Sequence, residues 1–189
     1  MESALIVSYS EKDTVFFKDL LNAASVYQIT SLQSCDSARR LVLKQDFDLV
    51  IVNAPLRDES GETFSRYIAS KGMTQVILLV KSEFFDSVSA VCEVDGVLTI
   101  SKPVNKEIFW SMLSLTKAVH NRIKKIQAEN EQLKQKIEDI RIIDRAKYVL
   151  ISCMNMSEQE AHRHIEKQAM DMRSTRRIIA EGILKKYGN

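Results

Sequence analysis

Basic side chains gather at the C-terminal end of this chain. Residues 141–189 contain ten Lys and Arg against six Asp and Glu, whereas residues 1–118 contain twelve against fifteen. Residues 119–140 lie between these two parts, with five basic and four acidic residues. A polyanion would be attracted to the C-terminal end and mildly repelled by the N-terminal one. A surplus of four positive charges over 49 residues is also common on solvated helices, so charge alone leaves both interpretations open.

Long basic side chains beside small residues suit nucleic-acid binding, because a loop's phosphates and unstacked bases can then approach closely. Small Ala161 and Ala169 fit this interpretation and fit helix packing equally well. His162 and His164 could stack on a base, although a solvated surface position is the simpler expectation. Met170 is expected to lie in a core. The basic candidates for contacts are Arg145, Lys147, Arg163, Arg173, Arg176 and Arg177.

No group of side chains has the spacing of a catalytic site, so we predict no enzymatic activity and no cofactor. The three cysteines (Cys35, Cys92 and Cys153) are scattered, and no metal-ligand spacing joins them to a histidine. We therefore expect no metal site, and ordinary thiols in a reducing compartment.

Three helical patterns follow one another between residues 142 and 186. The second opens at Ser157 with Glu160 three residues later, which is a capping-box pattern. The third starts near Ser174 and ends at Tyr187-Gly188, where Gly can cap a helix. The apolar positions expected to face a shared core are Ile142, Ile143, Ala146, Val149, Leu150, Ala161, Ile165, Ala169, Met172, Ile178, Ile179, Ile183 and Leu184.

This stretch closely resembles the ANTAR family, which is named after two transcription-antitermination regulators. The residues that carry the resemblance are Asp144-Arg-Ala-Lys147, Met156-Ser-Glu-Gln-Glu-Ala161, Ala169-Met170 and Ile179-Ala-Glu-Gly-Ile183. Spacing and residue type agree over three consecutive helices. The resemblance implies a three-helix module that binds paired hairpins in nascent messenger RNA and thereby prevents an overlapping terminator hairpin.

Short apolar runs alternate with helical patterns in the first 118 residues. The runs are Ala4–Val7, Ile29–Thr30, Asp48–Val52, Val76–Val80 and Val97–Ile100. Such alternation predicts an α/β fold with a doubly wound (flavodoxin-like) parallel sheet of five strands. A last helix follows Lys102-Pro103, and the residues expected on its inner face are Ile108, Phe109, Met112 and Leu115.

The same order resembles the receiver domain of bacterial response regulators, with Asn53 ending the third strand, Gly61 in the next loop and Lys102-Pro103 after the fifth strand. A working receiver has two acidic residues after strand one, an aspartate that accepts phosphate after strand three, and Thr or Ser after strand four. Of the functional residues of a working receiver, this chain retains only the lysine after strand five. The corresponding positions here are Ser8, Tyr9, Asn53, Val80 and Lys102.

The chemistry of these replacements predicts a degenerate receiver. The Asn53 amide is too weak a nucleophile to accept a phosphoryl group, and without the acidic pair a magnesium ion has few oxygen ligands. We expect neither phosphorylation nor phosphatase activity. Lys102 is expected to be structural, with Pro103 at an early position of the last helix.

A long Pro- and Gly-free stretch joins the two parts, from Val104 to about Ile151. Its apolar residues recur every seven positions, with Asn130 at an a position, as in a parallel dimeric coiled coil. The alternative is one long helix packed against its own domain. The predicted dimer seam consists of Val119, Ile123, Ile126, Asn130, Leu133, Ile137 and Ile140.

We therefore expect a degenerate receiver-like domain (1–118), a coiled-coil helix (119–141) and a small all-α ANTAR bundle (142–189). No membrane span or secretory signal is visible, so a cytoplasmic location is expected. The favoured function is a dimeric antiterminator that binds tandem RNA stem-loops, with a regulatory protein on the receiver-like domain as one source of control. A DNA-binding transcription factor and a pure protein-interaction scaffold are the alternatives.

Overall fold

The structure is a computed structural model and describes residues 1–187. The chain forms two compact units that divide between Lys125 and Ile126. We call them the N-terminal unit and the C-terminal unit. The dividing point lies within one helix, α5 (Lys106–Met154), which also contains both of the domain boundaries predicted from the sequence.

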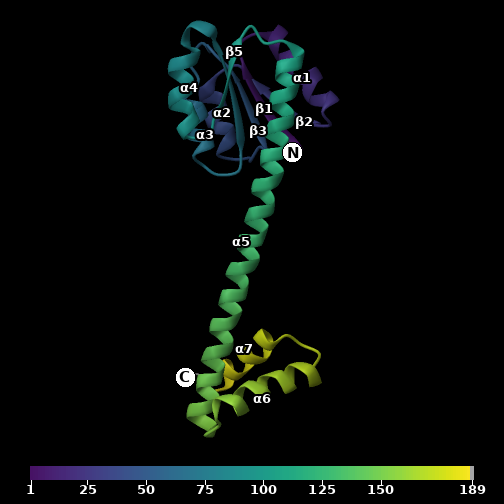
Figure 1. The fold of residues 1–189 in the computed structure, drawn as a ribbon, viewed down its shortest axis with the longest axis vertical. Coiled ribbons are helices and arrows are strands. Elements are labelled where there is room, and N and C mark those ends of the chain that lie inside the picture. Colours follow the sequence, from purple (N-terminus) through teal and green to yellow (C-terminus); the bar gives the residue numbers. More distant parts are fainter. Residues whose placement is uncertain (188–189) are drawn as a thin grey trace. The chain divides into compact units, whose positions relative to one another are not determined.

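A parallel five-stranded sheet is the centre of the N-terminal unit (Figure 1). Its strands are β1 (Ser3–Ser8), β2 (Gln28–Leu32), β3 (Leu49–Asn53), β4 (Gln75–Lys81) and β5 (Leu98–Lys102). They lie in the order β2-β1-β3-β4-β5, which is the doubly wound arrangement expected from the sequence. The order reverses between β1 and β3, and ligand crevices in such sheets lie at the carboxyl ends of the strands beside this point.

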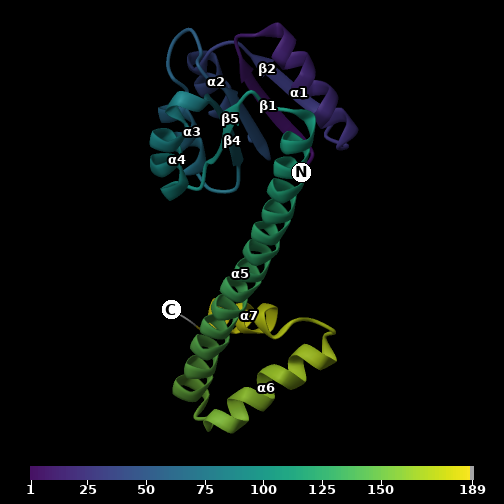
Figure 2. The same ribbon diagram turned by 45° about the horizontal axis from the view of Figure 1, so that its top comes forward.

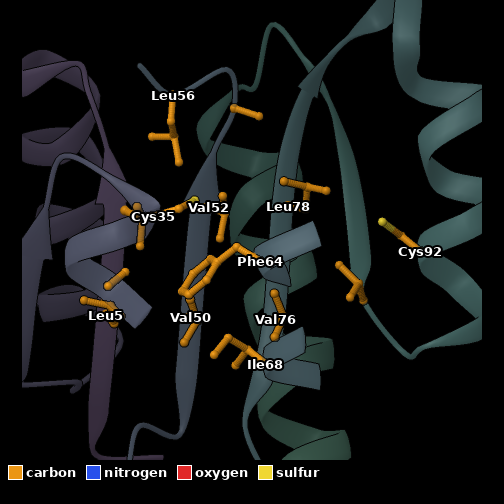
Figure 3. Packing of buried hydrophobic residues seen from close by; sticks show 14 of the residues in the cluster. Leu5, Cys35, Val50, Val52, Leu56, Phe64, Ile68, Val76, Leu78 and Cys92 are labelled. Carbon is orange, nitrogen blue, oxygen red and sulfur yellow. The ribbon is translucent and has the colours of Figure 1, made fainter. Parts of the chain in front are cut away.

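Alternation along each strand gives the sheet two apolar faces. Neighbours on β3 separate cleanly, since Val50 and Val52 join one core and Leu49 and Ile51 the other. The first core is covered by α2 (Cys35–Val42), α3 (Glu62–Ala69) and α4 (Phe85–Val94), and Figure 3 shows Phe64 of α3 over its strands. The second is covered by α1 (Glu11–Ala23) and the start of α5.

Two local sequences fix the entry of helices beside the crevice. Ser10 caps α1, because its hydroxyl accepts a hydrogen bond from the Asp13 amide. Gly61 precedes α3 with a φ of 83°, and a Cβ at this position would lie 2.7 Å from Val52 Cγ1. Glycine is therefore required there by both backbone conformation and space. A short 3-10 turn (η1, Ser82–Phe84) and α4 were not located from the sequence.

The start of α5 corrects two predictions. The helix begins at Lys106 rather than at Lys102-Pro103, because β5 continues through Lys102. Its inner face carries Phe109 and Leu113, which are buried, whereas Ile108 and Leu115 are about half exposed at 47% and 51%. The face continues through Thr116 and His120, two buried polar residues that an apolar pattern does not reveal.

His120 meets the beginning of the sheet. Its Nε2 lies 3.5 Å from Asp48 Oδ1 and makes no hydrogen bond. Burial lowers the pKa of His120, while the Asp48 carboxylate acts in the opposite direction. Asp48 accepts hydrogen bonds from the amides of Glu2 and Ser3. Its pKa is lowered, because these bonds and the nearby His120 together outweigh the opposing effect of burial.

The C-terminal unit consists of the end of α5, α6 (Glu158–Asp171) and α7 (Arg176–Tyr187), which Figure 2 shows side by side. The capping box at Ser157 and Glu160 is confirmed. The residues buried in its core are Ala146, Leu150, Ala161, Ile165, Ala169, Ile179, Ala180 and Ile183. The small Ala161 and Ala169 thus serve helix packing. The cap predicted at Gly188 lies outside the described residues.

Three apolar residues of this unit are exposed, contrary to prediction. Met170 is 78% exposed, Met172 69% and Ile178 57%. Met172 forms the C-cap of α6, where the helical pattern ends. Three packed helices also enclose only a narrow core. The predicted core position is therefore wrong for all three side chains. Within residues 1–187, no helix combines the length and apolarity that a membrane crossing requires.

Candidate nucleic-acid interface and the pocket at Asn53

The crevice at the carboxyl ends of β1 and β3 contains a closed polar network. The Asn53 side chain is buried, and its amide nitrogen donates to Ser8 Oγ and to Asp13 Oδ2, both at 2.9 Å. An aspartate at position 53 could not make these two donations. Asp13 was missed from the sequence, because it lies on α1, five residues beyond Ser8, and only the docking of α1 brings it to Asn53.

Lys102 lies beside this network. Its ammonium group donates a hydrogen bond to the Ala54 carbonyl oxygen, and the residue borders a hollow of about 600 Å³ together with Asp13 and Asn53. Burial lowers the pKa of Lys102, and the Asp13 carboxylate opposes that shift. The lysine thus links the end of β5 to the loop after β3, and it does not start the last helix, which begins at Lys106.

Val80 and Tyr9, the two other altered positions, lie in different surroundings. Val80 is buried in the core on the α3–α4 side of the sheet and does not border the hollow. Tyr9 is 43% exposed and stacks under the Arg57 guanidinium, 3.9 Å from the ring centre. Among the described residues, Asp13 and Glu83 are the only carboxylates that border the hollow.

A cluster of potential metal ligands lies at Cys35, and two of its three members interact with other groups. The Cys35 sulfur lies within 4.8 Å of carboxylate oxygens of Asp58 and Glu59. Burial, reinforced by a hydrogen bond to Glu59, raises the pKa of the Cys35 thiol, so that it stays protonated. Glu59 is also bound by Arg39, with 2.7 Å between the nearest nitrogen and oxygen.

Half of the six basic candidates in the C-terminal unit are held by acidic neighbours. Lys147 is only 17% exposed and lies 2.8 Å from Asp144 and 3.5 Å from Glu158. Its pKa is raised, chiefly by the hydrogen bond to Asp144. Arg176 contacts Glu166 at 3.2 Å. These side chains orient the ends of helices against one another.

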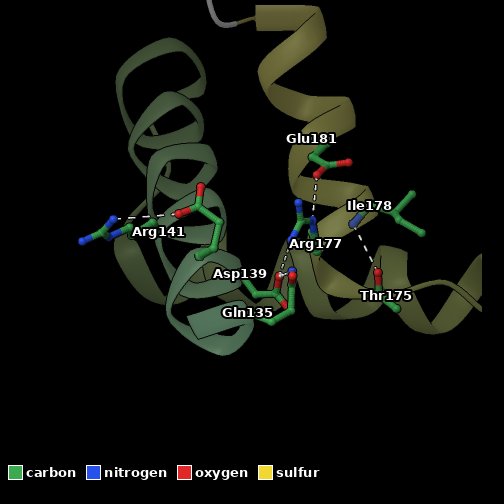
Figure 4. Close-up of polar contacts among 8 residues, drawn as sticks. Gln135, Asp139, Arg141, Thr175, Arg177, Ile178 and Glu181 are labelled. Carbon is green, nitrogen blue, oxygen red and sulfur yellow. Dashed lines mark hydrogen bonds and ion pairs between the residues drawn. The ribbon is translucent and has the colours of Figure 1, made fainter. Parts of the chain in front are cut away.

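Arg177 is the most extensively bound of the three (Figure 4). It reaches from α7 to Asp139 of α5 at 2.7 Å and to Glu181 at 2.8 Å. The guanidinium and a further hydrogen bond from Gln135 lower the pKa of Asp139. In Figure 4 the arginine lies between the two helices, and it therefore joins them as well as supplying charge.

The remaining candidates are exposed and have no ion pair with any residue in 1–187; they are Arg145, Arg163 and Arg173. The same holds for Lys167, Lys185 and Lys186, which the sequence analysis did not single out. Arg173 follows α6 with a φ of 48°, in the left-handed region that a side chain rarely adopts. Hydrogen bonds from the Arg173 and Ser174 amides to Met170 and Ala169 close the helix end around it.

The predicted dimer seam is exposed along α5. Val119 is 39% exposed, Ile126 47%, Leu133 55%, Ile137 52% and Ile140 58%, while Asn130 is exposed and Ile123 half-buried. A row of large apolar side chains in water favours association with another surface.

Comparison with known proteins identifies a family in the C-terminal part of the chain. Residues 131–184 match the ANTAR domain family. The chain is 26% identical over 141 residues to the transcriptional regulatory protein PdtaR of Mycobacterium tuberculosis, covering 75% of this chain and 69% of that protein. It is 25% identical over 137 residues to the aliphatic amidase regulator of Pseudomonas aeruginosa, covering 72% and 70%.

Solved structures resemble the N-terminal unit in fold. A signal receiver domain of an HD domain-containing protein from Pseudomonas fluorescens superposes with a TM-score of 0.57 at 20% identity, covering 66% of this chain and 92% of that one. A two-component response regulator from Clostridium difficile gives 0.53 at 16% identity, covering 62% and 97%. The chain thus combines an ANTAR domain with an N-terminal unit that has the receiver fold, which is the arrangement of an ANTAR response regulator.

Proposed function

We propose that this chain is a non-enzymatic, cytoplasmic antiterminator that binds tandem stem-loops in leader messenger RNA and prevents the terminator hairpin from forming. The observation that carries the proposal is the set of uncompensated cations on the ANTAR domain, Arg145, Arg163 and Arg173. Cations without acidic partners can bind phosphates without first breaking an ion pair. Lys147, Arg176 and Arg177 are assigned to the same interface, where they would act partly by holding the helices in place.

The proposed active form is a dimer joined through the seam on α5. An apolar row exposed to this degree loses water contact when two helices pair, and Asn130 at an a position fixes their register. A dimer carries two ANTAR bundles. Two linked modules bind two linked hairpins with an effective concentration that one module lacks. This division of labour follows the proposed parts 1–118, 119–141 and 142–189.

The receiver-type domain acts in this proposal without phosphorylation. The buried amide of Asn53 is bound on both of its N–H groups, and the positions of the acidic pair hold Ser8 and Tyr9. Control then passes through a regulatory protein that contacts the N-terminal unit, or through the abundance of the chain itself. Transfer of a stable phosphoryl label to the purified chain would contradict this part of the proposal.

Crosslinking to cellular RNA, followed by sequencing, tests the proposed target. We expect crosslinked fragments with two stem-loops directly upstream of terminators. Binding in vitro should favour such RNA over duplex DNA at matched salt. A preference for promoter DNA would instead support the DNA-binding alternative, and unchanged cellular output after replacement of Lys147, Arg173 and Arg176 by Ala would support the scaffold alternative.

The dimer is tested with two lysines placed in the seam. Ile126→Lys with Leu133→Lys should yield a monomer that binds one hairpin nearly as well as the natural chain does. It should lose the extra affinity for two hairpins, which for linked sites is roughly 10²–10⁴-fold. Ala128→Lys with Gln132→Lys is the matched control, because it adds the same charge at exposed positions on the helix face away from the seam. Equal behaviour of the two double variants would contradict the seam.

A further inference from the structure

A hollow of about 640 Å³ opens between the end of α5, α6 and α7 in the C-terminal unit. This volume lies in the range of about 300–1,000 Å³ that is typical of small-ligand sites. Its lining residues include Met154, His164, Gln168, Met172, Ile178 and Gly182. Neither the family comparison nor the ion pairs described above assign it a role.

The walls of this hollow are apolar and remain in contact with water. Met154 is 43% exposed, Met172 69% and Ile178 57%, although helical spacing would place the last two in a core. Tyr187 at the rim is 36% exposed and adds an aromatic ring. Large apolar side chains gathered around one concave site indicate a ligand with flat, weakly hydrated faces.

Two polar side chains stand on the α6 wall. His164 and Gln168 are one helical turn apart, and Gln168 Nε2 lies 3.1 Å from His164 Nε2. Within residues 1–187, the Gln168 side-chain oxygen and His164 Nδ1 have no protein partner. Amide and imidazole groups presented in this way read the hydrogen-bonding edge of a base. The hollow therefore combines apolar faces with a polar edge.

One cation lines the hollow, and three others lie next to its lining residues in the sequence. Lys186 lines it, 5.0 Å from the Tyr187 ring centre, and Arg173 directly follows Met172. Arg163 and Lys167 lie on α6 one residue before His164 and Gln168, and neither has an ion pair with a described residue. Phosphates on either side of a bound base would therefore meet positive charge.

We propose that this hollow binds one unstacked nucleobase from a hairpin loop, with His164 and Gln168 at the base edge. The proposal rests on the proposed function and adds the part of the RNA that the C-terminal unit reads. A groove for a protein helix would use the apolar walls, but it would leave the polar edge and the surrounding cations without a purpose.

Gly182 provides a test that does not require removing a packed side chain. An added Cβ at this position meets no atom within 4 Å, and the residue lines the hollow. Gly182→Leu should therefore extend a side chain into the hollow, and the change from glycine favours the helix. Gly182→Ala is the matched control, because it gives the same backbone effect with one methyl group. Gln168→Leu removes the polar edge, and Gln159→Leu, outside the hollow, is its control.

The probe is a pool of tandem RNA stem-loops with constant stems and randomised loops, bound by the full chain. We expect the natural chain to enrich one base at one loop position. Gly182→Leu and Gln168→Leu should each weaken binding of the enriched RNA by about tenfold or more, because the first excludes the stacked base and the second removes the polar edge that the base would contact. The salt dependence should not change, since no charge is altered. The two control variants should retain the natural affinity.

An abasic nucleotide at the enriched position completes the test. Natural chain and Gly182→Leu should bind the abasic RNA equally, because the base that the leucine excludes is already missing. If Gly182→Leu weakens abasic and intact RNA to the same extent, or leaves the loop preference unchanged, the base site is refuted while RNA binding stands. If the natural chain binds no stem-loop of the pool, the proposed function fails and the base site fails with it.

Discussion

Polar side chains are arranged differently in the two units of this molecule. In the N-terminal unit, Asn53 is bound to Ser8 and Asp13, and the Lys102 amine is bound to a loop carbonyl. In the C-terminal unit, Arg145, Arg163 and Arg173 face solvent without an acidic partner within the described residues. Groups that satisfy one another maintain a fold, and groups without a protein partner remain available to a ligand.

The apolar side chains differ in a similar way. Among the described residues, the sheet has two cores of sixteen and thirteen buried residues, whereas the core of the C-terminal unit has eight. The smaller unit also exposes Met154, Met170, Met172 and Ile178. A unit with so small a core has little stability to lose, and it presents apolar surface that a bound partner would cover.

The largest expected effect is the loss of the smaller core. Leu150→Ala should destabilise the C-terminal unit by about 2–5 kcal/mol, because it leaves a cavity among three helices. Hydrogen exchange followed along the chain should then show unprotected amides in α6 and α7 and an unchanged sheet. Tyr148→Ala, at a position 71% exposed, is the control and should change neither unit. Uniform loss of protection in both units would show that they unfold together.

The two groups of cations should respond differently to removal. Replacing Arg145, Arg163 and Arg173 by Ala should weaken RNA binding by at least about tenfold, since one charge-assisted hydrogen bond contributes roughly 1.5–3 kcal/mol. It should also lower the salt dependence by about 0.7–0.9 per lost phosphate contact.

Replacing Lys147, Arg176 and Arg177 by Ala is the charge-matched comparison. This change should mainly lower the thermal stability of the C-terminal unit, because Arg177 joins α5 to α7. Titrating a tandem stem-loop RNA with each triple variant at several salt concentrations measures its affinity and the salt dependence of that affinity. Identical salt slopes for the two triple variants would remove the distinction drawn between them.

A single substitution should break the hydrogen-bond network at Asn53. Asn53→Asp would place a second carboxylate 2.9 Å from that of Asp13 and remove both amide donations. We expect a loss of about 1–3 kcal/mol from the unfolding free energy of the N-terminal unit, without stable phosphorylation from a small phosphoryl donor. Urea denaturation measures the loss.

Exchanging the two groups provides the control. Asp13→Asn with Asn53→Asp restores one amide and one carboxylate, so most of the lost stability should return. Stable phosphorylation of the single variant, or no recovery in the double one, would show that the network does not determine the behaviour of this pocket.

The smallest expected effect is a pH dependence at His120. Its pKa in the folded unit lies below the ordinary value of 6.5, so the unfolded chain binds more protons once the pH falls through that value. Stability of the N-terminal unit should therefore fall as the pH decreases below 6.5, with a slope of at most about 1.4 kcal/mol per pH unit.

Urea midpoints at several pH values measure this slope, and His120→Gln should flatten it. The groups around His120 are Asp48, the N-terminal amine and Lys124. The pKa of Asp48 is lowered below 3.8, so its own contribution is lost only at more acid pH. A slope that persists in the variant would assign the effect to another group.

Much of this protein follows from its sequence alone. Five apolar runs separated by helical patterns specify the parallel sheet, because strands buried on both faces need continuous apolar stretches. The capping box at Ser157 is equally local, since its two hydrogen bonds join residues three apart. The family resemblance over three helices also depends only on residue type and spacing.

The tertiary structure decided what the sequence left open. Asp13 reaches Asn53 only because α1 packs beside β1, the neighbour of β3 in the sheet. Lys147, Arg176 and Arg177 differ from the other cations through acidic partners, among them Glu158, Glu166 and Asp139 on neighbouring helices. Met172 and Ile178 border a hollow rather than a core, which again depends on how the neighbouring helices pack. Spacing along a helix determines which residues share a face, but the packing of other helices determines what that face meets.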